Sequence, residues 1–245
     1  MGAGRHDERV TPTADEIRER HDRLVGRLRA VAAANGQDPH RLRIVAVTKG
    51  WPLEVVRAAL DAGLTMLGES RVQEAEPKIA AMPGAEWHLV GRLQSNKARR
   101  AARVFEVIHS VDSGALMDRL SGIAHDEGGR PRLLLQVNVT GEAAKAGLAP
   151  EDALAMAPAL ARVPLIGLMT IARMGATDEE ARRTFRRLRE LRDRLAQASG
   201  IGLEELSMGM SADAEAAPPR ARRSSGSGPR SSGREPRRYP PRSWS

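Results

Sequence analysis

The sequence predicts an α/β chain folded as a (β/α)8 TIM-type barrel that lacks its last strand and helix. Short apolar segments alternate with longer amphipathic segments along most of the 245 residues, which is the order expected of βαβ units in a parallel sheet. Most of the apolar segments are nearly continuous, as expected for strands covered on both faces. Seven such strands are too many for a small doubly wound domain, and they suit a barrel without its eighth strand.

The expected elements follow one another regularly along the chain. The strands are expected at 43–49, 65–70, 86–91, 106–112, 132–139, 164–171 and 204–211. The helices are expected at 14–34, 53–62, 71–81, 96–104, 114–127, 150–161 and 177–198. In the last helix Thr177 and Glu180 have the spacing of a capping box. Its apolar stripe is interpreted as a surface that packs on the sheet, and its arginine-rich face as solvated; the stripe is Phe185, Leu188, Leu191 and Leu195.

Composition excludes several classes of protein. There is no cysteine, so a disulfide scaffold, a cysteine-zinc site and a thiol nucleophile are all excluded. No apolar run has the length of a membrane span, and the charged N-terminus lacks the apolar core of a signal peptide. We therefore expect a cytoplasmic protein that does not contact membranes.

The net charge of +8 comes almost entirely from one end of the chain. Residues 218–245 contain eight arginines and one acid, whereas the other 217 residues contain 31 Lys+Arg and 30 Asp+Glu. This end is rich in Pro, Gly, Ser and Arg and has almost no aliphatic residues, so it cannot bury enough apolar surface to fold. The expected organisation is a barrel domain at 1–213 and a disordered tail at 214–245. An arginine-rich tail attracts phosphate, but no biological role in nucleic-acid binding is expected.

Polar residues gather where the expected strands end, which is where barrel enzymes carry their chemistry. Lys49 stands out because it ends a buried apolar strand and precedes Gly50. With its stem in apolar surroundings its pKa would fall, and the free amine needed for a Schiff base would be favoured. From position alone, a lysine that simply exits to solvent at a strand end is the favoured interpretation. The candidate residues at the strand ends are Thr48, Lys49, Glu69, Ser70, Arg71, His88, His109, Ser110, Asp112, Asn138, Met169, Thr170, Ser207, Met208 and Ser211.

The segment SMGMSAD at 207–213 has the form of a strand end, a glycine turn and a helix start. Backbone amides at such a helix start bind phosphate, although a plain helix cap fits the same residues. His88 and His109 lack metal-ligand spacing with each other or with carboxylates. We interpret them as packed or hydrogen-bonded histidines.

Seven segments taken together resemble the YggS/PROSC family of pyridoxal 5′-phosphate (PLP) homeostasis proteins. They are IVAVTKG, LGESRVQE, WHLVGRLQSNK, IHSVDS, LLQVNVTGEAAKAG, GLMTIA and LSMGMSAD, in order between residues 13 and 213. The resemblance implies the alanine racemase N-terminal-domain fold and a Schiff base between Lys49 and PLP. It also implies a phosphate cup of Ser207, Met208, Gly209 and Ser211, with Ser70, Met169 and Thr170 beside the cofactor. Position 70 is usually Asn in this family, so Ser70 is a departure.

The resemblance also implies a function. The chain is expected to hold PLP without dedicated catalysis, as a monomer whose partners are PLP and the apoenzymes that need it. The alternative is a PLP-dependent amino-acid racemase. Racemisation needs a proton acceptor on each face of the reacting carbon, and the only tyrosine, Tyr239, lies in the tail.

After about residue 214 the chain departs from the family, which continues with a helix and a last strand of the type VRIGTALFG. One choice of codons for residues 222–234, read in another frame, gives EVLRIGAALFGPR, which resembles that strand. We hypothesise that the chain after about residue 214 is a frameshifted reading. Resequencing of the gene tests this hypothesis.

Overall fold

A parallel seven-stranded sheet forms the centre of the computed structural model, which describes residues 11–128, 131–142, 145–173 and 175–209. Every strand pairs with its neighbour in sequence, so the order is β1-β2-β3-β4-β5-β6-β7. All seven predicted strands are present, each shorter than expected. They are β1 (Ala46–Val47), β2 (Met66–Glu69), β3 (Glu86–Leu89), β4 (Val107–Val111), β5 (Arg132–Gln136), β6 (Leu165–Met169) and β7 (Glu205–Ser207).

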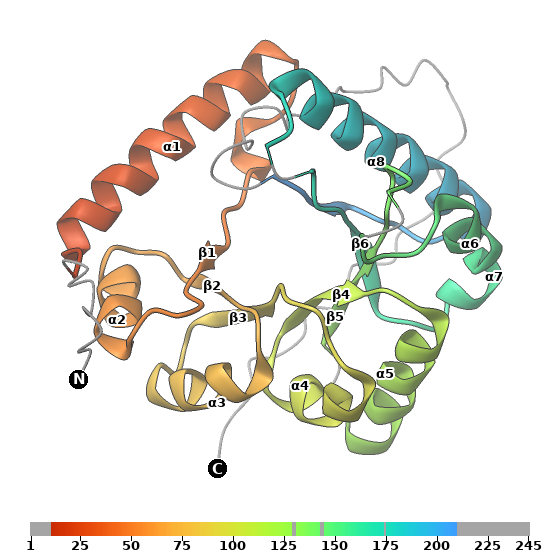
Figure 1. Cartoon of the computed structure of the whole chain (residues 1–245), viewed down its shortest axis with the longest axis horizontal. Helices are drawn as coiled ribbons and strands as arrows, with labels where there is room; N and C mark the ends of the chain where they lie inside the picture. The colour runs from red at the N-terminus through yellow and green to blue at the C-terminus, as the bar shows by residue number, and fades with distance from the viewer. Residues whose placement is uncertain (1–10, 129–130, 143–144, 174, 210–245) are drawn as a thin grey trace, which may run out of the picture.

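Helices surround the sheet as an outer ring (Figure 1). They are α1 (Ala14–Ala34), α2 (Leu53–Asp61), α3 (Val72–Ala81), α4 (Ala98–Val104), α5 (Gly114–Glu127), α6 (Pro150–Ala155), α7 (Ala157–Leu160) and α8 (Asp178–Ser199), with 3-10 turns η1 (Pro39–Arg41) and η2 (Ser95–Lys97). The helix expected at 150–161 is divided into α6 and α7. Pro158 accounts for the break, because a proline cannot donate the helical hydrogen bond and crowds the preceding turn.

The sheet has the form of a barrel that is open between its first and last described strands. Within the described ranges β1 pairs only with β2, and β7 pairs only with β6. Two ion pairs link the segment before β1 to the start of β7. Arg43 pairs with Glu205, the first residue of β7, and Arg41 pairs with the preceding Glu204 at 3.4 Å. The expected TIM-type parallel barrel is confirmed. The expected tail and the place of a last strand lie outside the described residues, so the domain boundary at 213 stays a prediction.

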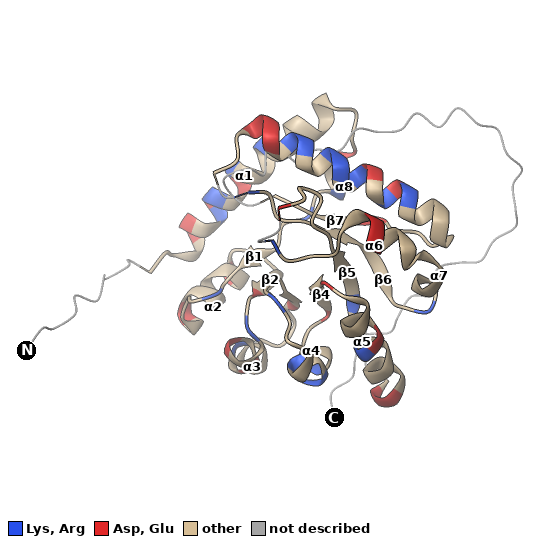
Figure 2. Cartoon of the chain, turned by 45° about the vertical axis from the view of Figure 1, so that its right-hand side comes forward, with Lys and Arg blue, Asp and Glu red and all other residues tan. Residues whose placement is uncertain are grey.

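The prediction for α8 is confirmed in detail. Glu180 N donates to the Thr177 hydroxyl at 3.3 Å, and Thr177 N donates to Glu180 Oε2 at 2.8 Å, which completes the capping box. Phe185, Leu188, Leu191 and Leu195 are buried. Basic and acidic residues alternate along the visible side of the helix (Figure 2), as expected of a solvated face.

The apolar core lies between the sheet and the ring of helices. Trp87, Leu89 and Ile108 from the strands belong to one buried apolar cluster with Leu116 and Leu188 from the helices. Alternate residues of the same strands point to the barrel interior, and several of those are polar. Within the described ranges no helix is long and apolar enough to cross a membrane.

Candidate functional site

Lys49 lies in a tight turn directly after β1. The turn spans residues 48–51 and is closed by a 3.1 Å hydrogen bond from Trp51 N to the Thr48 carbonyl. Gly50 occupies its third position with φ 72°, the left-handed conformation that a type II turn requires there. Lys49 is exposed and makes no hydrogen bond or ion pair with any other described residue. The expectation of an apolar environment for its stem is therefore wrong for the described part of the chain, where β1 has a strand neighbour on one side only and Val47 is itself 45% exposed.

A buried polar cluster lies immediately behind this turn. Lys78 Nζ donates to the Thr48 carbonyl at 2.8 Å and to Glu69 Oε1 at 2.7 Å, and the Thr48 hydroxyl donates to the same oxygen at 2.7 Å. Sequence reasoning placed Glu69 at a strand end but missed Lys78. Its position carries a signal, because it shares a helix face with the buried residues Val72 and Ala75.

The end of β7 brings the expected phosphate-binding residues to the same edge of the sheet as Lys49, because the carboxyl ends of parallel strands share one edge. The Ser207 hydroxyl lies 2.8 Å from His109 Nδ1, and its carbonyl accepts from Thr170 N at 3.1 Å. Met208 is half-buried and packs against the core. Gly209 follows with φ 85°. Ser211 lies outside the described residues, so its role stays a prediction.

Met169 and Ser70 both lie at the carboxyl edge of the sheet, but Met169 is more deeply buried. Met169 is 5% exposed and packs with Val107 and Leu134 inside the barrel. Ser70 follows β2 and is half-buried. Its carbonyl lies so close to Gly91 that a Cβ there would approach it to 2.2 Å. Thr170 is buried, with its hydroxyl donating to the Val137 carbonyl at 2.8 Å, so this hydroxyl is already engaged.

A chain of polar side chains runs through the barrel interior beneath Ser207. His109 Nε2 lies 2.8 Å from His88 Nδ1. His88 Nε2 is 3.0 Å from Glu86 Oε1, close enough for an ionic contact but without hydrogen-bond alignment. Arg132 donates to the same Glu86 oxygen at 2.6 Å. The interpretation of both histidines as hydrogen-bonded is confirmed.

The environment of this chain shifts two pKa values. Burial lowers the pKa of His109 to about 3, and repulsion by His88, Arg132 and Arg43 adds to that effect. The contact with His88 lowers the pKa of Glu86 to about 2 against the opposing effect of burial, and Arg132 contributes in the same direction. The interior therefore favours a neutral His109 and an ionised Glu86 at neutral pH.

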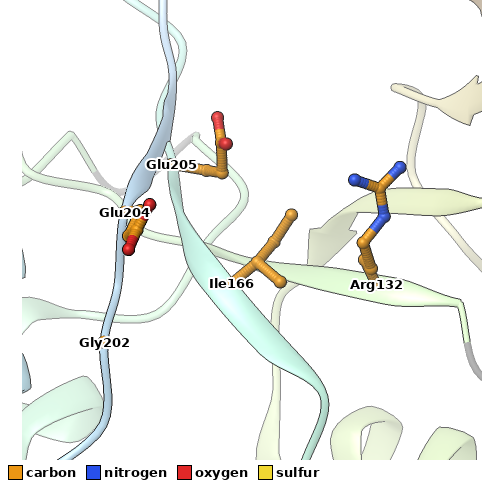
Figure 3. A pocket seen from close by; sticks show the side chains of 5 residues that line it. All are labelled: Arg132, Ile166, Gly202, Glu204 and Glu205. Carbon is orange, nitrogen blue, oxygen red and sulfur yellow. The ribbon is translucent and has the colours of Figure 1, made fainter. Parts of the chain in front are cut away.

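A pocket of about 220 Å³ lies at the end of the strands opposite to Lys49 (Figure 3). It is lined by Arg132, Ile166, Gly202, Glu204 and Glu205. Arg132 begins β5 and Glu205 begins β7, so this pocket opens at the amino-terminal edge of the sheet. Barrel chemistry is found at the carboxyl edge, which excludes this pocket as the counterpart of the Lys49 site.

The fold is a parallel barrel with a lysine directly after its first strand. Comparisons with known proteins identify the class of barrel to which it belongs. The family model for the alanine racemase N-terminal domain matches residues 22–224. Alanine racemase from Clostridium difficile 630 has a similar fold, with a TM-score of 0.64 over 82% of this chain and 52% of that chain, at 14% identity. The chain belongs to the alanine racemase N-terminal domain family.

More similar relatives place the chain within that family. A "Pyridoxal phosphate homeostasis protein" of Pseudomonas aeruginosa is 43% identical over 209 residues, which cover 82% of this chain and 88% of that protein. A protein of the same name from Aquifex aeolicus is 36% identical, with 81% and 90% covered. PipY of Synechococcus elongatus PCC7942, solved with PLP bound, is 41% identical with a TM-score of 0.69 and 79% and 92% covered. The chain is a member of the YggS/PROSC family, as its sequence motifs predict.

Proposed function

We propose that this protein binds PLP through a Schiff base on Lys49 and takes part in PLP homeostasis without dedicated catalysis. The observation that carries the proposal is the exposed amine of Lys49, which has no described partner and lies at the carboxyl edge of the barrel. The relatives of this barrel are PLP homeostasis proteins. PipY, which shares this fold and 41% of its residues, has been solved with PLP bound.

The chemistry needed from the protein is simple. PLP, when bound, supplies an aldehyde, and a neutral lysine amine condenses with it to form a C=N bond and release one water. Lys49 is exposed, so its amine is open to the ligand, and no described residue competes for it.

The phosphate of PLP fits the end of β7. The Ser207 hydroxyl can donate to a phosphate oxygen while its own oxygen accepts from His109, and the turn at Met208 and Gly209 can present backbone amides. Ser70 and Met169 complete the proposed site from β2 and β6, and Ser211 is proposed from the sequence alone.

Borohydride labelling tests the assignment. The protein is mixed with PLP, reduced and digested, and the modified lysine is identified by mass spectrometry. We expect the pyridoxyl group on Lys49 and its loss in Lys49→Arg, which keeps the charge. Lys145→Arg is the matched control, because Lys145 is engaged by Glu142 at 2.8 Å. A label on another lysine, or no label, contradicts the proposal.

Three parts of the functional prediction rest on the family resemblance. They are delivery of PLP to apoenzymes, a monomeric state and a cytoplasmic location. Racemisation is not proposed, because it needs a second proton acceptor opposite Lys49. The only tyrosine of the sequence, Tyr239, lies outside the described residues.

A further inference from the structure

Lys78 and Glu69 form the most deeply buried ion pair of the described chain. Glu69 is 0% exposed and Lys78 is 8% exposed, and within the described ranges no other Asp, Glu, Lys or Arg is classed as buried. The pair is joined by the 2.7 Å contact between Lys78 Nζ and Glu69 Oε1. It connects α3, which carries Lys78, with the end of β2, which carries Glu69.

A buried ion pair of this kind adds little to the stability of the folded protein. Removing two charges from water costs several kcal/mol per ion, and buried pairs often do no better than apolar residues of similar volume. Glu69 Oε2 adds to the cost, because it is buried and accepts no hydrogen bond from a described residue. An arrangement this costly is better explained by what it fixes in place.

What the pair fixes is Thr48, the residue before Lys49. The Thr48 amide donates to the Gly68 carbonyl at 2.8 Å, and its hydroxyl donates to Glu69. Its carbonyl accepts from Lys78 Nζ and from Trp51 N, which closes the turn around Lys49. Every polar group of Thr48 is therefore engaged, whereas the side chain of the next residue has no described partner.

The turn needs this support because the strand before it is weakly held. β1 is two residues long and pairs with one described neighbour, so the sheet contributes few hydrogen bonds to the position of residues 48–50. A lysine reaching from α3 replaces part of the missing support. The carbonyl that it holds is also the acceptor of the turn.

We propose that Lys78 is a positioning residue for Lys49. Its ammonium, oriented by Glu69, holds the Thr48 carbonyl and thereby the turn from which the Lys49 amine reaches the aldehyde of PLP. Lys78 does not touch the cofactor in this role. The inference rests on the proposed function and adds the residue that aims its reactive amine.

The test separates covalent capture of PLP from noncovalent binding. The double variant Lys78→Met with Glu69→Gln removes both charges together, so that no unpaired charge is left buried. The rate at which PLP forms a borohydride-reducible adduct on Lys49 is measured beside the dissociation constant of pyridoxine 5′-phosphate, which has no aldehyde. We expect the rate to fall at least tenfold and the dissociation constant to change less than twofold.

Two further variants keep the test decisive. Lys145→Met with Glu142→Gln removes a matched but more exposed pair and should change neither quantity. If the first double variant does not fold, Lys78→Gln with Glu69→Gln replaces it, because two amides can pair in the same space. An unchanged rate overturns the proposal, and so does a parallel loss of pyridoxine 5′-phosphate binding. Absence of label on Lys49 in the unaltered protein would instead overturn the proposed function.

Discussion

The Ser207 hydroxyl lies 2.8 Å from His109 Nδ1, which joins the carboxyl edge of the sheet to the polar chain inside the barrel. His109 is 4% exposed, and burial with nearby positive charge lowers its pKa to about 3. The neutral ring either accepts a hydrogen bond from the Ser207 hydroxyl or donates one to it, depending on its tautomer. In the donating tautomer the Ser207 hydroxyl keeps its own proton for a hydrogen bond to a ligand.

Stability is expected to fall with pH below about 6.5 because of His109. Its pKa is lower in the folded protein, about 3 against 6.5, so between these values the unfolded chain binds more protons. The stabilisation of the folded state by neutral His109 is fully present above pH 6.5. It declines as the pH falls, by up to about 1.4 kcal/mol per pH unit. Glu86, with its pKa lowered from 4.5 to about 2, adds a loss only below pH 4.5.

Urea unfolding between pH 7 and pH 5 measures this dependence. His109→Gln should flatten the slope, because an amide can hydrogen-bond but does not titrate. The control is His125→Gln, which changes an exposed histidine on α5 and should leave the slope as it is. Equal slopes in the unaltered protein and His109→Gln would contradict the assignment.

Ser207→Ala should weaken PLP binding through the phosphate alone. Hydrogen bonds to charged groups contribute about 1.5–3 kcal/mol, so the affinity for PLP should fall on the order of 10- to 100-fold. Pyridoxal lacks the phosphate, and its labelling of Lys49 should change little. Titration of visible absorbance with each aldehyde gives the comparison.

Ser199→Ala provides a control for that substitution. Ser199 ends α8 and donates to the Leu195 carbonyl at 2.7 Å, at the opposite end of the β-strands. It should leave both aldehydes unaffected. If Ser207→Ala weakens PLP and pyridoxal equally, the serine supports the site as a whole and is not a phosphate ligand.

The sequence was sufficient for the elements but not for the contacts between them. Apolar runs and amphipathic stripes predict every strand and the capping box at Thr177, because these depend on neighbours a few residues away. The pairing of Lys78 with Thr48 joins residues 30 positions apart. No local pattern specifies which buried carbonyl a lysine on a helix will reach.

Lys49 also shows that the local sequence does not specify contacts between elements, because the sequence predicts a burial of its stem that the structure does not show. An apolar run before a lysine predicts a buried stem only if the strand has neighbours on both sides. In the described chain β1 has one neighbour, and Lys49 is exposed. The family resemblance identified the residue as a site candidate, which stays a prediction, while the reasoning about its environment depended on contacts that the local sequence does not contain.

Thr177→Ala should destabilise the protein by about 1 kcal/mol, the usual cost of losing a helix N-cap. The hydroxyl accepts from Glu180 N, so its loss leaves an amide of the first turn without its cap. Thr177→Ser keeps the hydroxyl and serves as the control. Urea unfolding measures both, and equal stability of the two variants would show that the cap contributes little.

Gly167 should tolerate no side chain, because β6 and β7 approach each other closely there. Gly167 is paired with Glu205, and a Cβ at position 167 would lie 1.8 Å from the Glu205 carbonyl oxygen. The obstacle is backbone, so the strands themselves must separate. Overpacking of this kind costs about 1–3 kcal/mol, and each kcal/mol corresponds to roughly 2–4 °C in Tm for a chain of this size.

Gly122→Ala is the matched control for Gly167→Ala. Gly122 is exposed on α5 with no atom within 4 Å of the added Cβ, and alanine favours a helix over glycine by about 1 kcal/mol. Thermal unfolding should therefore show a lower Tm for Gly167→Ala and an equal or higher Tm for Gly122→Ala. Because β7 carries Ser207, Gly167→Ala should also weaken PLP more than pyridoxal. A normal Tm with normal PLP affinity would show that β7 is not held against β6 as described.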